Sequence, residues 1–324
     1  MVDVTDQINQ CKHLVAYLKK SGSAHILPHA VVQESKTRWN TKAEMLNSIA
    51  RQHSEIRELL QGKGQEHRIE GIQVEVLTAV GEFLTPFKHA SEDMEGDRYP
   101  TINSVLLWYH RLRMHCEPRC GDPLYMEHIR RRAGELLNDK MTITPIHKIA
   151  TFLSPRFKSL KMLSPDESLV VQAEARRLTT ALIPALQAQT AQKQAADDTS
   201  ETQREAEAIG PTMRENLLKR RRMFLEWEDT LDLIEPDEVQ HCMQSHFSLD
   251  ECNEDVLGFW GAHCHDFPLM SMLARAVLCV PATSASSKRA FSSVGRVLEA
   301  RRNRLNPGTV DAILFLHSAS KQLS

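Results

Sequence analysis

Apolar residues recur along this 324-residue chain at intervals of three and four, which is the spacing of an amphipathic helix. The first stripe covers residues 4–18 and ends before Gly22, and the second begins at Thr41 and continues to Gly62. Further helical patterns cover roughly 69–89, 101–116, 124–138 and 165–188, whereas the alternation typical of strands is scarce. The pattern therefore predicts a mostly α fold.

The helical pattern is interrupted between residues 186 and 210. This segment is rich in Gln, Ala, Thr, Asp and Glu and contains almost no large apolar residues. We expect a flexible connection with residual helicity there. A basic-to-acidic helix candidate follows it, and a last apolar run begins at about Asp266.

The C-terminal run divides into three short apolar stripes. They are formed by Leu269, Leu273 and Val277, by Phe291, Val294 and Leu298, and by Val310, Ile313 and Leu314. Asn306 and Pro307 are a plausible cap and first turn for the last helix. Phe315 and Leu316 fall outside its stripe, so this helix is apolar on more than one face and needs two neighbours. One neighbour could be a second chain, or both could belong to its own domain.

Charge and composition limit the classes of protein to which this chain could belong. The 40 basic and 42 acidic residues give a net charge of −2, so any contact with DNA must come from local patches. Such patches occur at residues 130–132, 219–222 and 301–304, where a solvated helix face is the commoner explanation, and 219–222 is the best candidate for a nuclear import signal. No stretch has the length and apolarity of a secretory or membrane-spanning segment, so no membrane association is expected. Seven cysteines without a secretory signal suggest reduced thiols.

Candidate chemistry is sparse. His and Cys residues gather between His241 and His265, but the group lacks a Cys-x-x-Cys pair and fits no common zinc finger. Reduced core cysteines and surface histidines explain it better, although zinc binding stays open. The chain has no glycine-rich phosphate loop, nucleophile elbow or His-Glu-x-x-His motif. We therefore expect no cofactor and no metal.

Four segments of the sequence occur in the same order as in the hAT superfamily of DNA transposases and in the host proteins derived from them, and they resemble the segments of that family. The longest is FPLMSMLARAVLCVPATSASSKRAFSSVGRVLEARRNRLNPGTVDAILFLHS, which resembles the family's C-terminal dimerisation region. The others are ESKTRWNTKAEML, FLTPFKHASEDMEGDRYPTINSVLLWYHRL and IHKIATFLSPRFKSL, the last with Ser154 where the family has Asp. Together they cover most of residues 35–318.

The resemblance also implies what the active site would require. Active members are RNase-H-like nucleases that hold two divalent metals with two Asp and one Glu, because both the attacking and the leaving oxygen need a cation. In the family, the two Asp lie upstream of the Thr-Arg-Trp segment, on strands that we do not expect in this chain. The Glu position falls on Lys288, whose positive charge opposes metal binding. We therefore expect no enzymatic activity.

By resemblance, the fold is a helical insertion domain with C-terminal helices of a truncated RNase-H-like domain. The expected plan has an N-terminal helix and Arg-Trp segment (1–40), an insertion domain (41–185), a flexible linker (186–210), the continued insertion domain (211–265) and a dimerisation region (266–320).

The first functional hypothesis is a non-enzymatic homodimerisation and interaction module in nuclear transcription or chromatin regulation, with chromatin or transcription-factor proteins as partners. Its expected apolar centre consists of Leu273, Leu278, Phe291, Val294, Leu298, Val310, Leu314 and Phe315. The alternative is a DNA-binding remnant that does not cleave. In that case Arg38 and Trp39 are the candidate DNA contacts, since an aromatic face can stack on an unpaired base.

Overall fold

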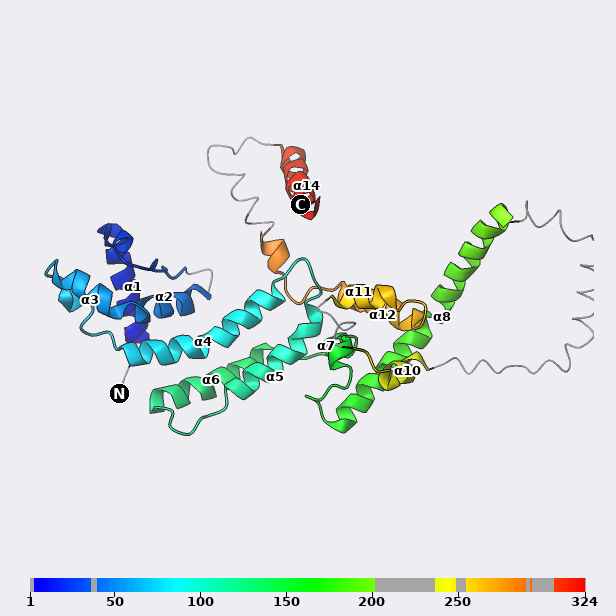
Figure 1. Ribbon diagram of the computed structural model, residues 1–324, viewed down its shortest axis with the longest axis horizontal. Helices are drawn as coiled ribbons and strands as arrows, with labels where there is room; N and C mark the ends of the chain where they lie inside the picture. The colour runs from blue at the N-terminus through cyan, green and yellow to red at the C-terminus, as the bar shows by residue number, and fades with distance from the viewer. Residues whose placement is uncertain are drawn as a thin grey trace, which may run out of the picture. The chain divides into compact units, whose positions relative to one another are not determined.

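A computed structural model describes residues 3–35, 40–201, 237–248, 255–289, 292 and 306–323, and within these it leaves out the side chains of 189–201, 314 and 317–323. The chain divides into two compact units. Unit 1 comprises Met1–Ile143 with Ala282–Ser324, and unit 2 comprises Thr144–Pro281. All regular elements of the described ranges are helices, which confirms the mostly α prediction (Figure 1).

Unit 1 is built on helices α1 (Val4–Lys20), α2 (Asn40–Ala50), α3 (His53–Gln61), α4 (Val74–Met94), α5 (Val105–His115) and α6 (Leu124–Lys140). Cys11, Val15 and Leu18 of the predicted stripe on α1 are buried, and α2 packs along α4. Their shared core includes Leu14, Leu18, Met45, Ile49 and Leu77. Unit 1 also includes the last helix, α14 (Pro307–Leu323).

The stripe over residues 41–61, predicted as one helix, forms two helices that separate at Gln52. The buried side chain of Gln52 accepts a hydrogen bond from His29 N at 3.2 Å and donates to His29 O at 3.0 Å. This side chain thus binds the backbone of the preceding loop, and the chain turns between α2 and α3. Apolar spacing alone could not locate this break.

Unit 2 contains α7 (Pro145–Phe152), α8 (Pro165–Glu201), α10 (Glu238–Gln244), α11 (Val256–Ala262) and α12 (Pro268–Leu278). Buried Val171, Ala175 and Thr179 follow one another at four-residue steps on α8, and small side chains at this spacing let a second helix approach closely. That second helix is α12, which packs along α8.

Helix α8 continues to Glu201, into the segment 186–210 that we expected to be a flexible connection with residual helicity. Residues 202–210 lie outside the described part of the chain. The predicted domain limits follow the plan of the hAT family, and they stay predictions beside the two units found here.

Candidate dimerisation interface

The centre of the C-terminal region is α12, an apolar helix of unit 2. Pro268 occupies its first turn, where the missing N–H costs nothing. Its buried stripe follows helical spacing and consists of Met270, Leu273, Ala274, Val277 and Leu278. Because α7, α8, α10 and α11 all contact α12, this helix is a core element of its unit.

The N-terminus of α12 is capped by a carboxylate from another helix. Glu238 of α10 is buried and accepts hydrogen bonds from Leu269 N at 3.1 Å and Met270 N at 2.9 Å. These two N–H groups lie in the first turn, where a helix leaves its donors without partners and attracts negative charge. Burial raises the pKa of Glu238, and the two N–H groups oppose that rise. Glu238 thus fixes α10 against α12.

Aromatic side chains fill the space beside α11 and α12. The ring centre of Phe247 lies 4.9 Å from that of Phe259 and 6.2 Å from that of Phe267, and His263 stacks on Phe259 at 4.2 Å. The indole of buried Trp260 donates to Leu153 O at 2.7 Å. This hydrogen bond satisfies the polar edge of a large apolar side chain and joins α11 to the end of α7.

Lys158 caps the C-terminal end of α10. Its ammonium donates to Cys242 O at 2.6 Å and to Ser245 O at 2.5 Å, and it lies 4.5 Å from the centre of the Phe247 ring. A cation at a helix C-terminus pairs with the carbonyls left over there. Burial raises the pKa of the neighbouring Cys242 thiol to about 11, so this cysteine is a protonated core residue at neutral pH.

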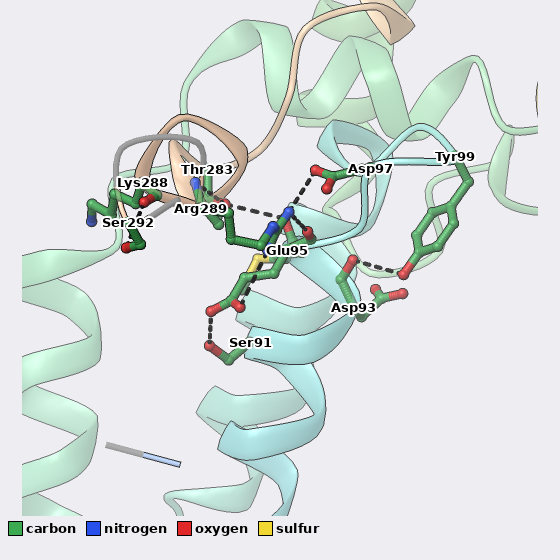
Figure 2. A network of polar contacts seen from close by, with 11 residues as sticks. Ser91, Asp93, Glu95, Asp97, Tyr99, Thr283, Lys288, Arg289 and Ser292 are labelled. Carbon is green, nitrogen blue, oxygen red and sulfur yellow. Dashed lines mark hydrogen bonds and ion pairs between the residues drawn. The ribbon is translucent and has the colours of Figure 1, made fainter. Parts of the chain in front are cut away.

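After α12 the chain enters unit 1 and binds the end of α4, as Figure 2 shows. Ala282 N donates to Thr101 Oγ1 at 2.9 Å, and Thr283 Oγ1 donates to Met94 O at 3.3 Å. Arg289 reaches the turn after α4, where it binds Glu95 and Asp97. Lys288, which precedes it, is exposed.

The last helix, α14, presents large apolar side chains to solvent. It begins at Pro307, as expected, and Asn306 Oδ1 accepts a hydrogen bond from Gly308 N at 3.1 Å. Phe315 is 72% exposed and Leu316 is 66% exposed, whereas Val310 and Ile313 are half-buried. Phe315 and Leu316 therefore form an exposed apolar face on α14.

Residues 238–320, from the start of α10 into α14, match the hAT family C-terminal dimerisation region. The chain carries a hAT dimerisation region. This match confirms the resemblance noted in the C-terminal segment of the sequence. The match begins at residue 238, upstream of residue 266, where we had placed the beginning of the region.

Relatives of the chain agree with this match. Zinc finger protein 618 of Homo sapiens is 22% identical over 280 residues, which are 86% of this chain and 27% of that protein. The putative AC transposase of Zea mays is 27% identical over 108 residues, 33% of this chain and 13% of the relative. Zinc finger BED domain-containing protein 4 of Homo sapiens is 26% identical over 162 residues, 49% of this chain and 13% of the relative. The chain spans about a quarter of the length of zinc finger protein 618.

The residues expected at the centre of the hAT dimerisation region belong to both units. Leu273 and Leu278 are buried in unit 2, at 4% and 3% exposure, whereas Val310 and Phe315 lie on α14 of unit 1. Phe291, Val294, Leu298 and the side chain of Leu314 lie outside the described residues. Arg38 and Trp39, the candidate DNA contacts, lie outside them as well.

The His and Cys residues before α12 remain a separate question. Within the described ranges no group of three or more His, Cys, Asp or Glu side chains could hold a metal ion, and Cys252 is not among those residues. Every cysteine that the structure describes is a free thiol. None of the described helices combines the length and apolarity needed to cross a membrane.

Sequence reasoning missed the polar residues that hold the hAT dimerisation region together. Glu238, Lys158 and Arg289 each join segments that are far apart in the chain, and hydrophobic spacing carries no information about such partners. Arg289 could have been noticed as the neighbour of Lys288, but its acidic partners lie more than a hundred residues upstream.

Proposed function

We propose that this chain is a non-enzymatic module, derived from a hAT transposase, that forms homodimers and recruits protein partners in nuclear transcription or chromatin regulation. The observation that supports self-association best is the uncovered apolar face of α14, with Phe315 and Leu316, inside a region that matches a dimerisation family. Two adjacent exposed residues of this size are an unusual pair for a helix that stays in water.

A second copy of the chain is the occupant that this face fits. Burying one Phe or Leu side chain is worth about 1.5–3 kcal/mol, and a two-fold arrangement doubles every contact because both copies contribute the same patch. The position of α14 within residues 238–320 argues for a second copy over an unrelated protein.

The absence of catalysis is supported by the charge at Lys288. Two-metal nucleases need converging carboxylates, and the resemblance places this exposed lysine at the glutamate position. A cationic side chain there repels divalent ions.

Light scattering over a range of protein concentrations tests self-association. We expect a mass near twice 36.8 kDa for the native chain and a shift to 36.8 kDa when Phe315→Asp and Leu316→Asp are combined. The matched control is Leu124→Asp in α6, which charges a residue of 75% exposure outside the matched region and should leave the dimer intact. A native chain that stays monomeric would refute self-association, and a dimer that survives both α14 substitutions would refute this surface.

Nuclear location rests on the names of the relatives and on the basic run 219–222. Two of the relatives are named as zinc finger proteins, and a short run of Lys and Arg is typical of nuclear import signals. A fluorescent fusion should therefore accumulate in the nucleus and should lose this accumulation when residues 219–222 are changed to Ala. A native fusion distributed evenly between nucleus and cytoplasm would contradict the proposal.

A further inference from the structure

Polar contacts join residues 282–289 to the end of α4 and to the loop that follows it. Arg289 Nη2 donates to Glu95 O at 2.6 Å and to Asp97 Oδ1 at 2.5 Å, and Nη1 lies 3.8 Å from Glu95 Oε2 (Figure 2). The backbone N–H of Ala282 donates to Thr101 Oγ1, and the hydroxyl of Thr283 donates to Met94 O. None of the residues from Ala282 to Arg289 is fully buried, so the segment contributes no side chain to the core.

Arg289 lies where negative charge from several sources adds up. Helix α4 ends at Met94, and the last carbonyls of a helix lack intrahelical donors and carry the negative end of its dipole. The guanidinium pairs with one such carbonyl and with two carboxylates at once. Its planar fork of donors suits this task better than a lysine ammonium would.

Contacts that do not involve the segment prepare this acceptor site. Ser91 Oγ donates to Glu95 Oε1 at 3.1 Å, and the hydroxyl of Tyr99 donates to Asp93 O at 3.2 Å, so both ends of the turn are tied to the last residues of α4. A preformed acceptor loses less entropy when the arginine binds. Lys288 has the same charge as Arg289, but in Figure 2 its side chain points away from the acidic turn.

We propose that Arg289 is an electrostatic latch, which fixes the end of segment 282–289 to the turn after α4 and opens as ionic strength rises. The partners are half-exposed, with side chains 43% exposed for Arg289 and 53% for Asp97, so salt reaches and screens them. The latch joins two parts of one chain, and it therefore goes beyond the proposed function and does not depend on self-association.

Hydrogen–deuterium exchange of a peptide covering residues 280–289 tests the latch in the full chain. Arg289→Gln removes the guanidinium and should speed exchange by about two- to fivefold, the range expected for half-exposed ion pairs. The matched control is Lys288→Gln, which removes the same charge one residue earlier and should exchange like the native chain. Salt at about 1 M should speed exchange in the native chain and in Lys288→Gln, but hardly in Arg289→Gln.

A second test swaps the charges of Arg289 and Asp97. Arg289→Glu should speed exchange, and adding Asp97→Arg should restore part of the protection because the pair is rebuilt with opposite signs. Equal rates in the native chain and in Arg289→Gln would overturn the latch, as would an equal acceleration by Lys288→Gln. Circular dichroism should show unchanged helix content in all variants, and light scattering on the same samples reports self-association separately, so either proposal can fail alone.

Discussion

Helices α12 and α14 belong to the same matched region, and both carry apolar residues at helical spacing. They differ in whether these residues are buried or exposed. The stripe of α12 is buried inside unit 2, with Leu273 only 4% exposed. Helix α14 leaves Phe315 72% exposed. One family region thus combines a helix that stabilises the chain it belongs to with a helix that offers an apolar surface.

The difference lies in what surrounds each helix. Four other helices contact α12, and Glu238 caps its N-terminus from α10. The face of α14 that holds Phe315 and Leu316 has no such cover among the described residues. Substitutions in α12 should therefore change the stability of the fold, and substitutions in α14 should change association.

The largest expected effect on stability is that of Leu273→Ala. Removing a buried leucine side chain costs about 2–5 kcal/mol, because both the transfer free energy and the contacts around the cavity are lost. Urea unfolding followed by circular dichroism measures this loss, with Leu316→Ala as the matched control in α14. Equal losses for the two variants would break the distinction between the helices.

A smaller loss is expected for Trp260→Phe beside α12. Phenylalanine keeps much of the aromatic packing but cannot donate to Leu153 O, so a buried carbonyl loses its indole partner. An unsatisfied buried polar group costs about 1–3 kcal/mol. The same unfolding experiment measures the loss, and a variant as stable as the native chain would show that the hydrogen bond contributes nothing to unit 2.

How much of this could be predicted from the sequence depends on the kind of interaction. Spacing predicted helices at α1, α12 and α14, and it placed Leu273 and Val277 on the stripe of α12 that is buried, because a helix repeats every 3.6 residues. It could not show that Leu273 is buried and Phe315 exposed, because burial is decided by neighbours distant in the chain. The same limit applies to Glu238 and Arg289, whose partners follow no period.

The cap of α12 should give stability a characteristic pH dependence. Burial raises the pKa of Glu238 above its ordinary value of 4.5, so the folded chain keeps this proton at pH values where the unfolded chain has released it. The contribution of this carboxyl to stability is therefore greatest below pH 4.5 and falls as the pH rises through the raised value.

Glu238→Gln isolates this contribution because its amide does not titrate. The unfolding free energy of the native chain minus that of the variant, measured by urea unfolding from about pH 4.5 upward, should decrease with rising pH. A difference that increases with pH would mean that the two N–H groups of α12 outweigh burial at this carboxyl.

The smallest expected change in stability is that of Phe315→Ser in α14. This exposed side chain loses little when the chain unfolds, so the unfolding free energy of the monomer should change by less than about 0.5 kcal/mol. Self-association nevertheless adds a signature, because binding to the folded state raises the Tm with concentration. We therefore expect the Tm of the native chain to rise with protein concentration and the Tm of Phe315→Ser to stay constant, with the two converging at high dilution. If both Tm values rose alike, the surface that joins two copies would lie away from α14, and the contrast between α12 and α14 would describe folding alone.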